Sequence, residues 1–169
     1  MLRGSAKYVK QNLGNNLTVA EVGTRSGEYA LVLLDRLPIK QLYMVDFFHP
    51  YQDGEFYQTA DIQNFYCREL YRKVIFNNFC TTTLVQQPSA LASSIFPDGF
   101  FDYVYIDACH DYDMVKLDLK NWFPKVKKNG ILGGHDFKAF PGVEKAVREF
   151  SSNVEVFNDD GDWMIGGTQ

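Results

Sequence analysis

The side chains best suited to chemistry lie in two short stretches, each near the end of an apolar run. Asp107 lies in the run 101–108, and Asp136 follows Gly133-Gly134-His135 in the run 130–137. If these runs are neighbouring parallel strands, both carboxylates lie at one edge of a sheet, where they repel unless one is protonated or a cation neutralises them. Mg²⁺ prefers oxygen ligands, so the pair predicts a magnesium site. Alternatively, Asp107 caps its strand or binds another ligand, and Asp136 is a turn residue.

A histidine three residues after Asp107 lies where a general base would be needed. His110 can take the proton of a hydroxyl group, which is a poor nucleophile until that proton is lost. Alternatively, His110 is an exposed loop residue or caps the following helix. His135 is a weaker candidate because it can point away from Asp136 on its strand, and His49 is interpreted as a surface residue.

A glycine-containing turn predicts a nucleoside ligand. The sequence Glu21-Val-Gly23-Thr-Arg25-Ser-Gly27 follows an apolar run and precedes a helical pattern, so the turn lies at the carboxyl edge of the sheet, where ligands bind. Asp46 ends the second run, about 20 residues later, where an acid can accept both ribose hydroxyls. A dinucleotide fingerprint would place a glycine at position 25, so Arg25 argues against a bound pyrophosphate. The alternative is a structural turn with an unrelated strand-end aspartate.

The elements that must position these residues alternate along the chain. Five strands are predicted at 17–23, 41–48, 81–87, 101–108 and 130–137, with helices at 26–37, 89–94, 112–128 and 143–150. Two final strands, 154–157 and 163–165, are joined through an Asp-Gly turn, which favours an antiparallel hairpin. The pattern predicts one α/β domain over 1–169, with a doubly wound, Rossmann-like sheet of seven mostly parallel strands and an antiparallel last strand.

The helix 112–128 and the segment 51–80 both carry large apolar side chains. The helix 112–128 is expected to bury Met114, Leu117, Trp122 and Val126 and to carry lysines 125, 127 and 128 on its last turn. The segment 51–80 is rich in Phe and Tyr, and its part 59–73 is predicted to be helical. This aromatic segment is either an ordinary crossover helix with core side chains, or a lid or dimer surface beside the site.

The chain resembles the class I S-adenosylmethionine-dependent methyltransferases. The likeness rests on the Glu21–Gly27 turn, Asp46 and the C-terminal hairpin, which an NAD-binding Rossmann domain lacks. It implies that Glu21 orients the methionyl amine, that Gly23 and Gly27 line the methionine and that Asp46 holds the ribose. The resemblance also assigns further cofactor-binding residues, namely Thr24, Ser26, Phe47 and Asp107.

Three stretches resemble one branch of that superfamily, the macrolide-sugar O-methyltransferases and related proteins of methyltransferase family 24. They are FDYVYIDACHDY, KKNG and GGHDF. The likeness implies that Asp107 and Asp136 bind Mg²⁺ and that His110 is the base, acting on a hydroxyl of a small molecule such as a sugar. The alternatives are a metal-free methyltransferase acting on nitrogen or oxygen and a non-catalytic module of the same fold; an NAD-dependent oxidoreductase ranks lowest.

Composition narrows the partners and the compartment. The chain has 169 residues, of which 46% are hydrophobic, and its 17 basic and 21 acidic residues give a net charge of −4. An acidic balance argues against nucleic-acid binding, which needs basic surface. Three scattered cysteines fit a reducing cytoplasm. The N-terminal residues 1–17 lack a continuous apolar stretch, so neither a signal peptide nor a membrane span is predicted there. A homodimer through the aromatic segment stays open.

Overall fold

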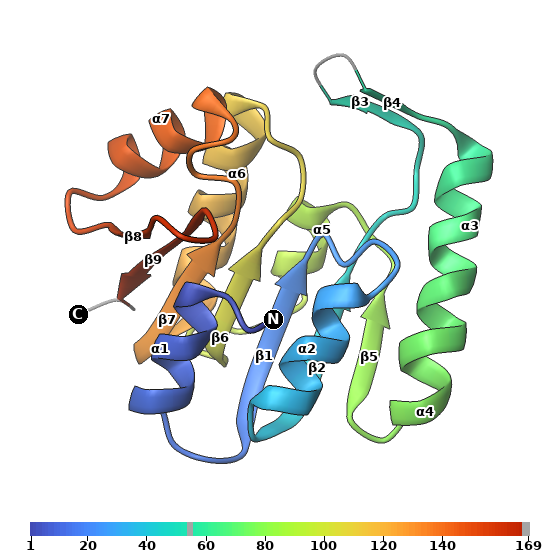
Figure 1. Cartoon of the computed structure of the whole chain (residues 1–169), viewed down its shortest axis with the longest axis horizontal. Coiled ribbons are helices and arrows are strands. Elements are labelled where there is room, and N and C mark those ends of the chain that lie inside the picture. The colour runs from blue at the N-terminus through green and yellow to red at the C-terminus, as the bar shows by residue number, and fades with distance from the viewer. Residues whose placement is uncertain (54–55, 167–169) are drawn as a thin grey trace.

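A seven-stranded sheet runs through the centre of the computed structural model, which describes residues 1–53 and 56–166 (Figure 1). Its strand order is β5-β2-β1-β6-β7-β9-β8. The five strands from β5 to β7 are parallel, and β9 is antiparallel to both of its neighbours. The strands are β1 (Leu17–Val22), β2 (Ile39–Val45), β5 (Thr82–Val85), β6 (Phe101–Ile106), β7 (Val126–Gly134), β8 (Glu155–Phe157) and β9 (Asp162–Gly166). This confirms the predicted fold class and the terminal hairpin.

Helices cover both faces of the sheet (Figure 1). One face carries α1 (Gly4–Asn12), α2 (Glu28–Arg36), α3 (Ala60–Leu70), a π-helical turn (Tyr71–Ile75) and α4 (Phe76–Asn78). The other carries α5 (Ser89–Ser94), α6 (Tyr112–Trp122) and α7 (Pro141–Phe150). Within the described part of the chain, no helix is long and apolar enough to cross a membrane.

The side-chain alternation of the central strands decides which core each residue joins. Tyr103 and Tyr105 of β6 pack in the core beneath α1 and α2, whereas Val104 and Ile106 pack in the core beneath α6 and α7. Successive residues of a strand point to opposite faces. Asp107 continues the series of the two tyrosines, so it lies on the side of the sheet that α1 covers.

The prediction of a helix over 112–128 is wrong at its carboxyl end. α6 stops at Trp122, a short 3₁₀ turn follows, and β7 begins at Val126. Pro124 explains the early end, because proline has no backbone N–H and its ring clashes with the preceding helical turn. Lys127 therefore lies on a strand, where its Nζ pairs with Asp102 at 2.8 Å.

The buried face of α6 also differs from the prediction. Met114 and Leu117 are 45% and 40% exposed, whereas Val115 and Leu119 are buried. The helix thus turns the neighbouring stripe of its surface toward the sheet. Trp122, which belongs to both stripes, is fully buried as expected.

The aromatic segment contains the expected helix and an unexpected hairpin. Thr59 caps α3, and its hydroxyl accepts a hydrogen bond from the backbone N–H of Ile62. Before it, β3 (Tyr51–Asp53) and β4 (Phe56–Gln58) form a separate two-stranded ladder. Several aromatic side chains are exposed rather than core residues, so the core interpretation is wrong for them: Tyr51, Tyr57, Phe65, Tyr71, Phe76 and Phe79.

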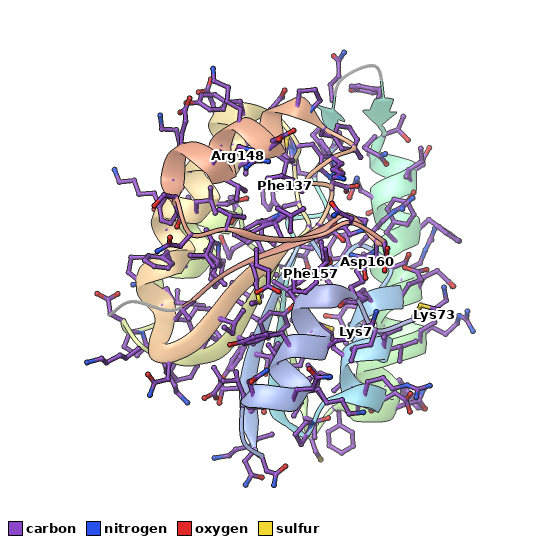
Figure 2. The ribbon with its side chains drawn as sticks, turned by 60° about the vertical axis from the view of Figure 1, so that its left-hand side comes forward. Lys7, Lys73, Phe137, Arg148, Phe157 and Asp160 are labelled. Atoms are coloured by element: carbon purple, nitrogen blue, oxygen red, sulfur yellow. The ribbon has the colours of Figure 1, made fainter. Side chains whose placement is uncertain are left out.

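Helix α1, which the sequence did not predict, is attached to the sheet by a buried polar cluster. Asp162 accepts hydrogen bonds from the backbone N–H of Ser5 at 2.9 Å and from its hydroxyl at 2.6 Å. Its other oxygen accepts from the hydroxyl of Tyr105 at 2.7 Å. Gly4 packs directly against Phe157 of β8, at a position where any Cβ would overlap the ring. Figure 2 shows Phe157 beside α1.

We expect Asp162→Ala to lower the free energy of unfolding by about 3 kcal/mol, because buried donors on Ser5 and Tyr105 lose their acceptor. Asp159→Ala, in the same turn but exposed, is the matched control and should change it by less than about 0.5 kcal/mol. Chemical denaturation of the three proteins measures both effects. Equal stability of the two variants would show that Asp162 does not hold α1.

Candidate active site

The carboxyl ends of the central strands open into one cleft of about 900 Å³. Most of the predicted site residues line it, namely Glu21, Gly23, Thr24, Asp46, Phe47, Asp107, His110 and Asp136. The predicted cofactor residues Ser26 and Gly27 are not among the described residues that line the cleft. The hydroxyl of Ser26 donates to the carboxylate of Glu28 instead.

Two glycines of the turn have different roles. Gly23 has φ +88°, and a Cβ there would overlap the backbone carbonyl of Asp107, so only glycine lets the ends of β1 and β6 approach this closely. Gly27 has φ +81°, and a Cβ there would meet Val74 and Leu70. Gly27 therefore serves the packing of α2 against the helical segment 60–78.

Arg25 replaces a glycine of the commoner motif without changing the shape of the turn. Its φ of +51° lies in the left-handed region that glycine would adopt. Its backbone N–H donates to Asp46 Oδ2 at 2.8 Å, and its guanidinium lies 4.4 Å from the centre of the Tyr66 ring. The side chain is thereby held by α3 at the rim of the cleft.

Asp46 is oriented by backbone donors. Its Oδ1 accepts from the N–H of Phe48 at 3.0 Å, and its Oδ2 accepts from the N–H of Arg25. An ionised carboxylate has about four lone-pair positions. Backbone N–H groups use some of them, and the remainder can accept hydroxyl groups of a ligand, as a ribose requires.

Glu21 is the most deeply buried acid of the cleft. It is 2% exposed and accepts a hydrogen bond from the hydroxyl of Thr24. Burial raises the pKa of Glu21 to about 8. A positively charged group brought beside it would favour the ionised form. The residues at this end of the cleft therefore fit S-adenosylmethionine. Glu21 suits its ammonium group, Asp46 suits its ribose hydroxyls, and Gly23 leaves room for a ligand close to the backbone.

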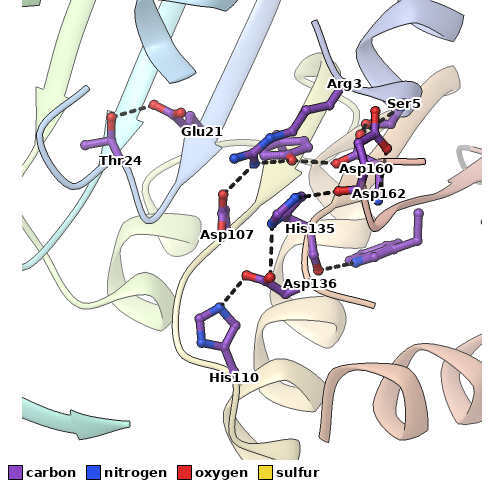
Figure 3. A network of polar contacts seen from close by, with 12 residues as sticks. Arg3, Ser5, Glu21, Thr24, Asp107, His110, His135, Asp136, Asp160 and Asp162 are labelled. Carbon is purple, nitrogen blue, oxygen red and sulfur yellow. Dashed lines mark hydrogen bonds and ion pairs between the residues drawn. The ribbon is translucent and has the colours of Figure 1, made fainter. Parts of the chain in front are cut away.

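At the other end of the cleft, three side chains gather as potential metal ligands. One ligand atom from each of Asp107, His110 and Asp136 lies within 4.8 Å of the others (Figure 3). Carboxylates and imidazole together suit a divalent cation. Asp136 has φ +61°, a conformation that few non-glycine residues adopt and that often marks functional sites. The residues present therefore fit a metal ion.

Asp136 lies between two histidines. Its carboxylate oxygens are 3.0 Å from His110 Nε2 and 3.2 Å from His135 Nδ1. Burial alone would raise the pKa of Asp136, but contacts with both imidazoles hold it well below its usual range. His135 Nε2 also lies 2.7 Å from the carbonyl oxygen of Asp160. Both nitrogens of His135 face acceptors, and although burial opposes it, the hydrogen bond to Asp136 raises the pKa of His135.

Arg3 also belongs to the site, although no sequence pattern pointed to it. Its NH1 donates to Asp107 Oδ2 at 2.7 Å and to the hydroxyl of Tyr105 at 2.6 Å. It directly precedes α1, which packs on the face of the sheet to which Tyr105 points. The alternation Tyr103, Tyr105, Asp107 identified that face. The partner could not be found, because the contact spans 104 positions of sequence.

Comparison with known proteins places the chain in a family. Residues 20–137 match a sequence family, methyltransferase family 24, described as a methyltransferase domain. That match covers more than half of the chain, which therefore belongs to this family. No curated protein sequence matches the chain.

Solved structures share the fold at low sequence identity. The Streptococcus mutans protein SMU.1697c, in complex with SAH, has a TM-score of 0.67 and 12% identity, covering 98% of this chain and 99% of that one. An rRNA methylase from Streptococcus thermophilus has a TM-score of 0.65 and 10% identity, covering 100% and 99%. A precorrin-6y C5,15-methyltransferase from Geobacter metallireducens has a TM-score of 0.64 and 15% identity, covering 90% of this chain and 70% of that one. The fold is that of the class I S-adenosylmethionine-dependent methyltransferases.

The raised pKa of Glu21 predicts that cofactor binding is coupled to proton release. At pH 7, below about 8, the ligand-free carboxyl group holds its proton, and a ligand ammonium should displace it. Calorimetry with S-adenosylhomocysteine in buffers of different ionisation enthalpy should show release of close to one proton from this group, which Glu21→Gln abolishes. Glu144→Gln, on the exposed surface of α7, is the control. The same proton count in wild type and Glu21→Gln would contradict the prediction.

Proposed function

We propose that this protein transfers the methyl group of S-adenosylmethionine to a hydroxyl group of a small molecule, such as a sugar. In this proposal Asp107 and Asp136 hold a divalent cation such as Mg²⁺, and His110 is the general base. The observation that carries it is the gathering of Asp107, His110 and Asp136 in the same cleft as Glu21 and Asp46.

In this proposal one end of the cleft binds the methyl donor and the other end activates the acceptor. S-adenosylmethionine supplies a methyl group already activated by the sulfonium charge, so the protein must align the acceptor and remove its proton. Glu21 would bind the amine of the cofactor and Asp46 its ribose, which directs the methyl group toward Asp107. A divalent cation held by Asp107 and Asp136 would supply Lewis acidity that lowers the pKa of an acceptor hydroxyl.

The contact with Asp136 suits His110 to act as the base. The ionised Asp136 lies 3.0 Å from Nε2 of His110, where it orients the imidazole and favours a proton on that nitrogen. His110 would take the proton of the acceptor hydroxyl, and Asp136 would stabilise the resulting imidazolium. Phe140 stacks on the imidazole with 4.1 Å between ring centres and fixes its plane.

The size and charge of the site support a small acceptor. A cleft of about 900 Å³ is within the range of pockets for small ligands. The net charge of −4 speaks against a large phosphate-coated partner, although some proteins of this fold are rRNA methylases. A cytoplasmic location agrees with three scattered cysteines in a protein of this length.

A metal-free methyltransferase is the second candidate, and one observation favours it. Arg3 already neutralises Asp107 through an ion pair of 2.7 Å. In that case His110 alone would activate a nitrogen or oxygen acceptor. A non-catalytic module of the same fold is distinguished by calorimetry, since it should show no binding of S-adenosylhomocysteine.

Removal of the Asp107 or His110 side chain should separate cofactor binding from methyl transfer. Asp107→Ala and His110→Ala are expected to retain binding of S-adenosylhomocysteine and to lose methyl transfer by about 100-fold or more, since each removes activation of the acceptor. The assay measures transfer from methyl-labelled S-adenosylmethionine to a panel of sugars and other hydroxylated small molecules. Asp98→Ala, at an exposed loop, is the control. Full activity of both variants would contradict the roles of Asp107 as metal ligand and His110 as general base.

Chelation distinguishes the two candidates. If the cation assists the reaction, excess EDTA should abolish methyl transfer and added Mg²⁺ should restore it, while S-adenosylhomocysteine still binds. Unchanged turnover in EDTA would support the metal-free reaction and exclude the assisted one.

A further inference from the structure

The carboxylate of Asp107 has a partner that the chain itself provides. Arg3 NH1 lies 2.7 Å from Asp107 Oδ2, and the two side chains are only 25% and 23% exposed (Figure 3). An ion pair shielded from solvent in this way is weakened less by salt than a surface pair. The guanidinium is therefore a fixed part of the cleft rather than a mobile surface charge.

Several contacts hold Arg3 in this place. Its guanidinium lies over the ring of Tyr29, 4.3 Å from the ring centre, and 5.6 Å from the centre of the Tyr105 ring. The hydroxyl of Tyr105 accepts from Arg3 and donates to Asp162, which also binds Ser5 at the start of α1. The packing of α1 on the sheet thus determines where the positive charge lies.

A guanidinium and a divalent cation cannot share one carboxylate without cost. Arginine stays charged at every physiological pH, so the repulsion cannot be relieved by loss of a proton. Asp107 is also one of the three side chains whose ligand atoms lie within 4.8 Å of one another. A cation bound there must either displace Arg3 from the carboxylate or bind beside its charge, and each lowers the affinity.

We propose that Arg3 is a positioning residue that holds the Asp107 carboxylate in the cleft and competes with a divalent cation for it. The inference rests on the proposed role of Asp107 as a metal ligand. It adds that the residue preceding α1 sets the affinity of that site. Removing the guanidinium should therefore strengthen metal binding, which is the opposite of what loss of a purely structural contact would do.

The test is a titration of the protein with Mn²⁺ alone, in which the electron paramagnetic resonance signal of the free ion is the readout. Arg3→Met should bind Mn²⁺ about tenfold more tightly than wild type, or more, because the competing charge is gone. Arg3→Lys should stay close to wild type, since it keeps the charge. Adding Asp107→Asn to Arg3→Met should remove the gain. Arg36→Met, at an exposed arginine on α2, is the matched control and should leave the affinity unchanged.

A second variant covers the case in which Arg3→Met does not fold. Tyr105→Phe removes only the hydroxyl that links Arg3 to Asp162, and it should raise the affinity for Mn²⁺ by a smaller factor. Equal or weaker binding in the folded variant than in wild type overturns the proposal, as does absence of Mn²⁺ binding from every protein. S-adenosylhomocysteine binding is measured in the same samples. Its loss from wild type would count against the methyltransferase function, whereas its retention confines a failure to the role of Arg3.

Discussion

The repulsion among carboxylates at one edge of the sheet is the constraint on which the site depends. Parallel strands bring Glu21, Asp46, Asp107 and Asp136 into a single cleft, and each is stabilised by a different device. Glu21 is buried with a pKa raised to about 8, whereas Asp46 is held by two backbone N–H groups. Asp107 pairs with Arg3, and Asp136 lies between two histidines. The cleft accommodates these acids because Asp107 and Asp136 have cationic or ionisable partners, and burial raises the pKa of Glu21 and of Asp46.

These devices divide the cleft into two chemically different parts. Glu21 and Asp46 have no cationic side chain as their hydrogen-bond partner among the contacts of the described residues, so they suit the ammonium and hydroxyl groups of a ligand. Asp107 and Asp136 already have cationic or ionisable groups of the chain as partners, Arg3 for Asp107 and His110 for Asp136. On the proposed function, the same sheet edge would bind the methyl donor at one end and activate an acceptor at the other.

The sequence predicted those features that depend on local pattern. The mostly parallel α/β sheet, the terminal hairpin and the gathering of strand-end acids follow from alternation and from the Asp-Gly turn. Two errors were also local, since Pro124 ends α6 earlier than the apolar pattern suggests and α6 buries Val115 rather than Met114. Arg3 could not be predicted, because its place depends on how α1 packs over β7 and β9, which no local pattern encodes.

The acceptor is determined outside the sheet. Proteins of this fold include an rRNA methylase and a precorrin methyltransferase, at 10% and 15% identity, so the shared sheet does not select the substrate. In this chain the rim of the cleft is built by the segment after β2, where the ring of Phe47 stacks on His49, and by Tyr66 of α3 with Arg25. Flat aromatic and guanidinium surfaces at a rim favour a planar or ring-shaped acceptor through stacking. On the proposed function, selectivity among acceptors should therefore reside in residues that the sheet positions only indirectly.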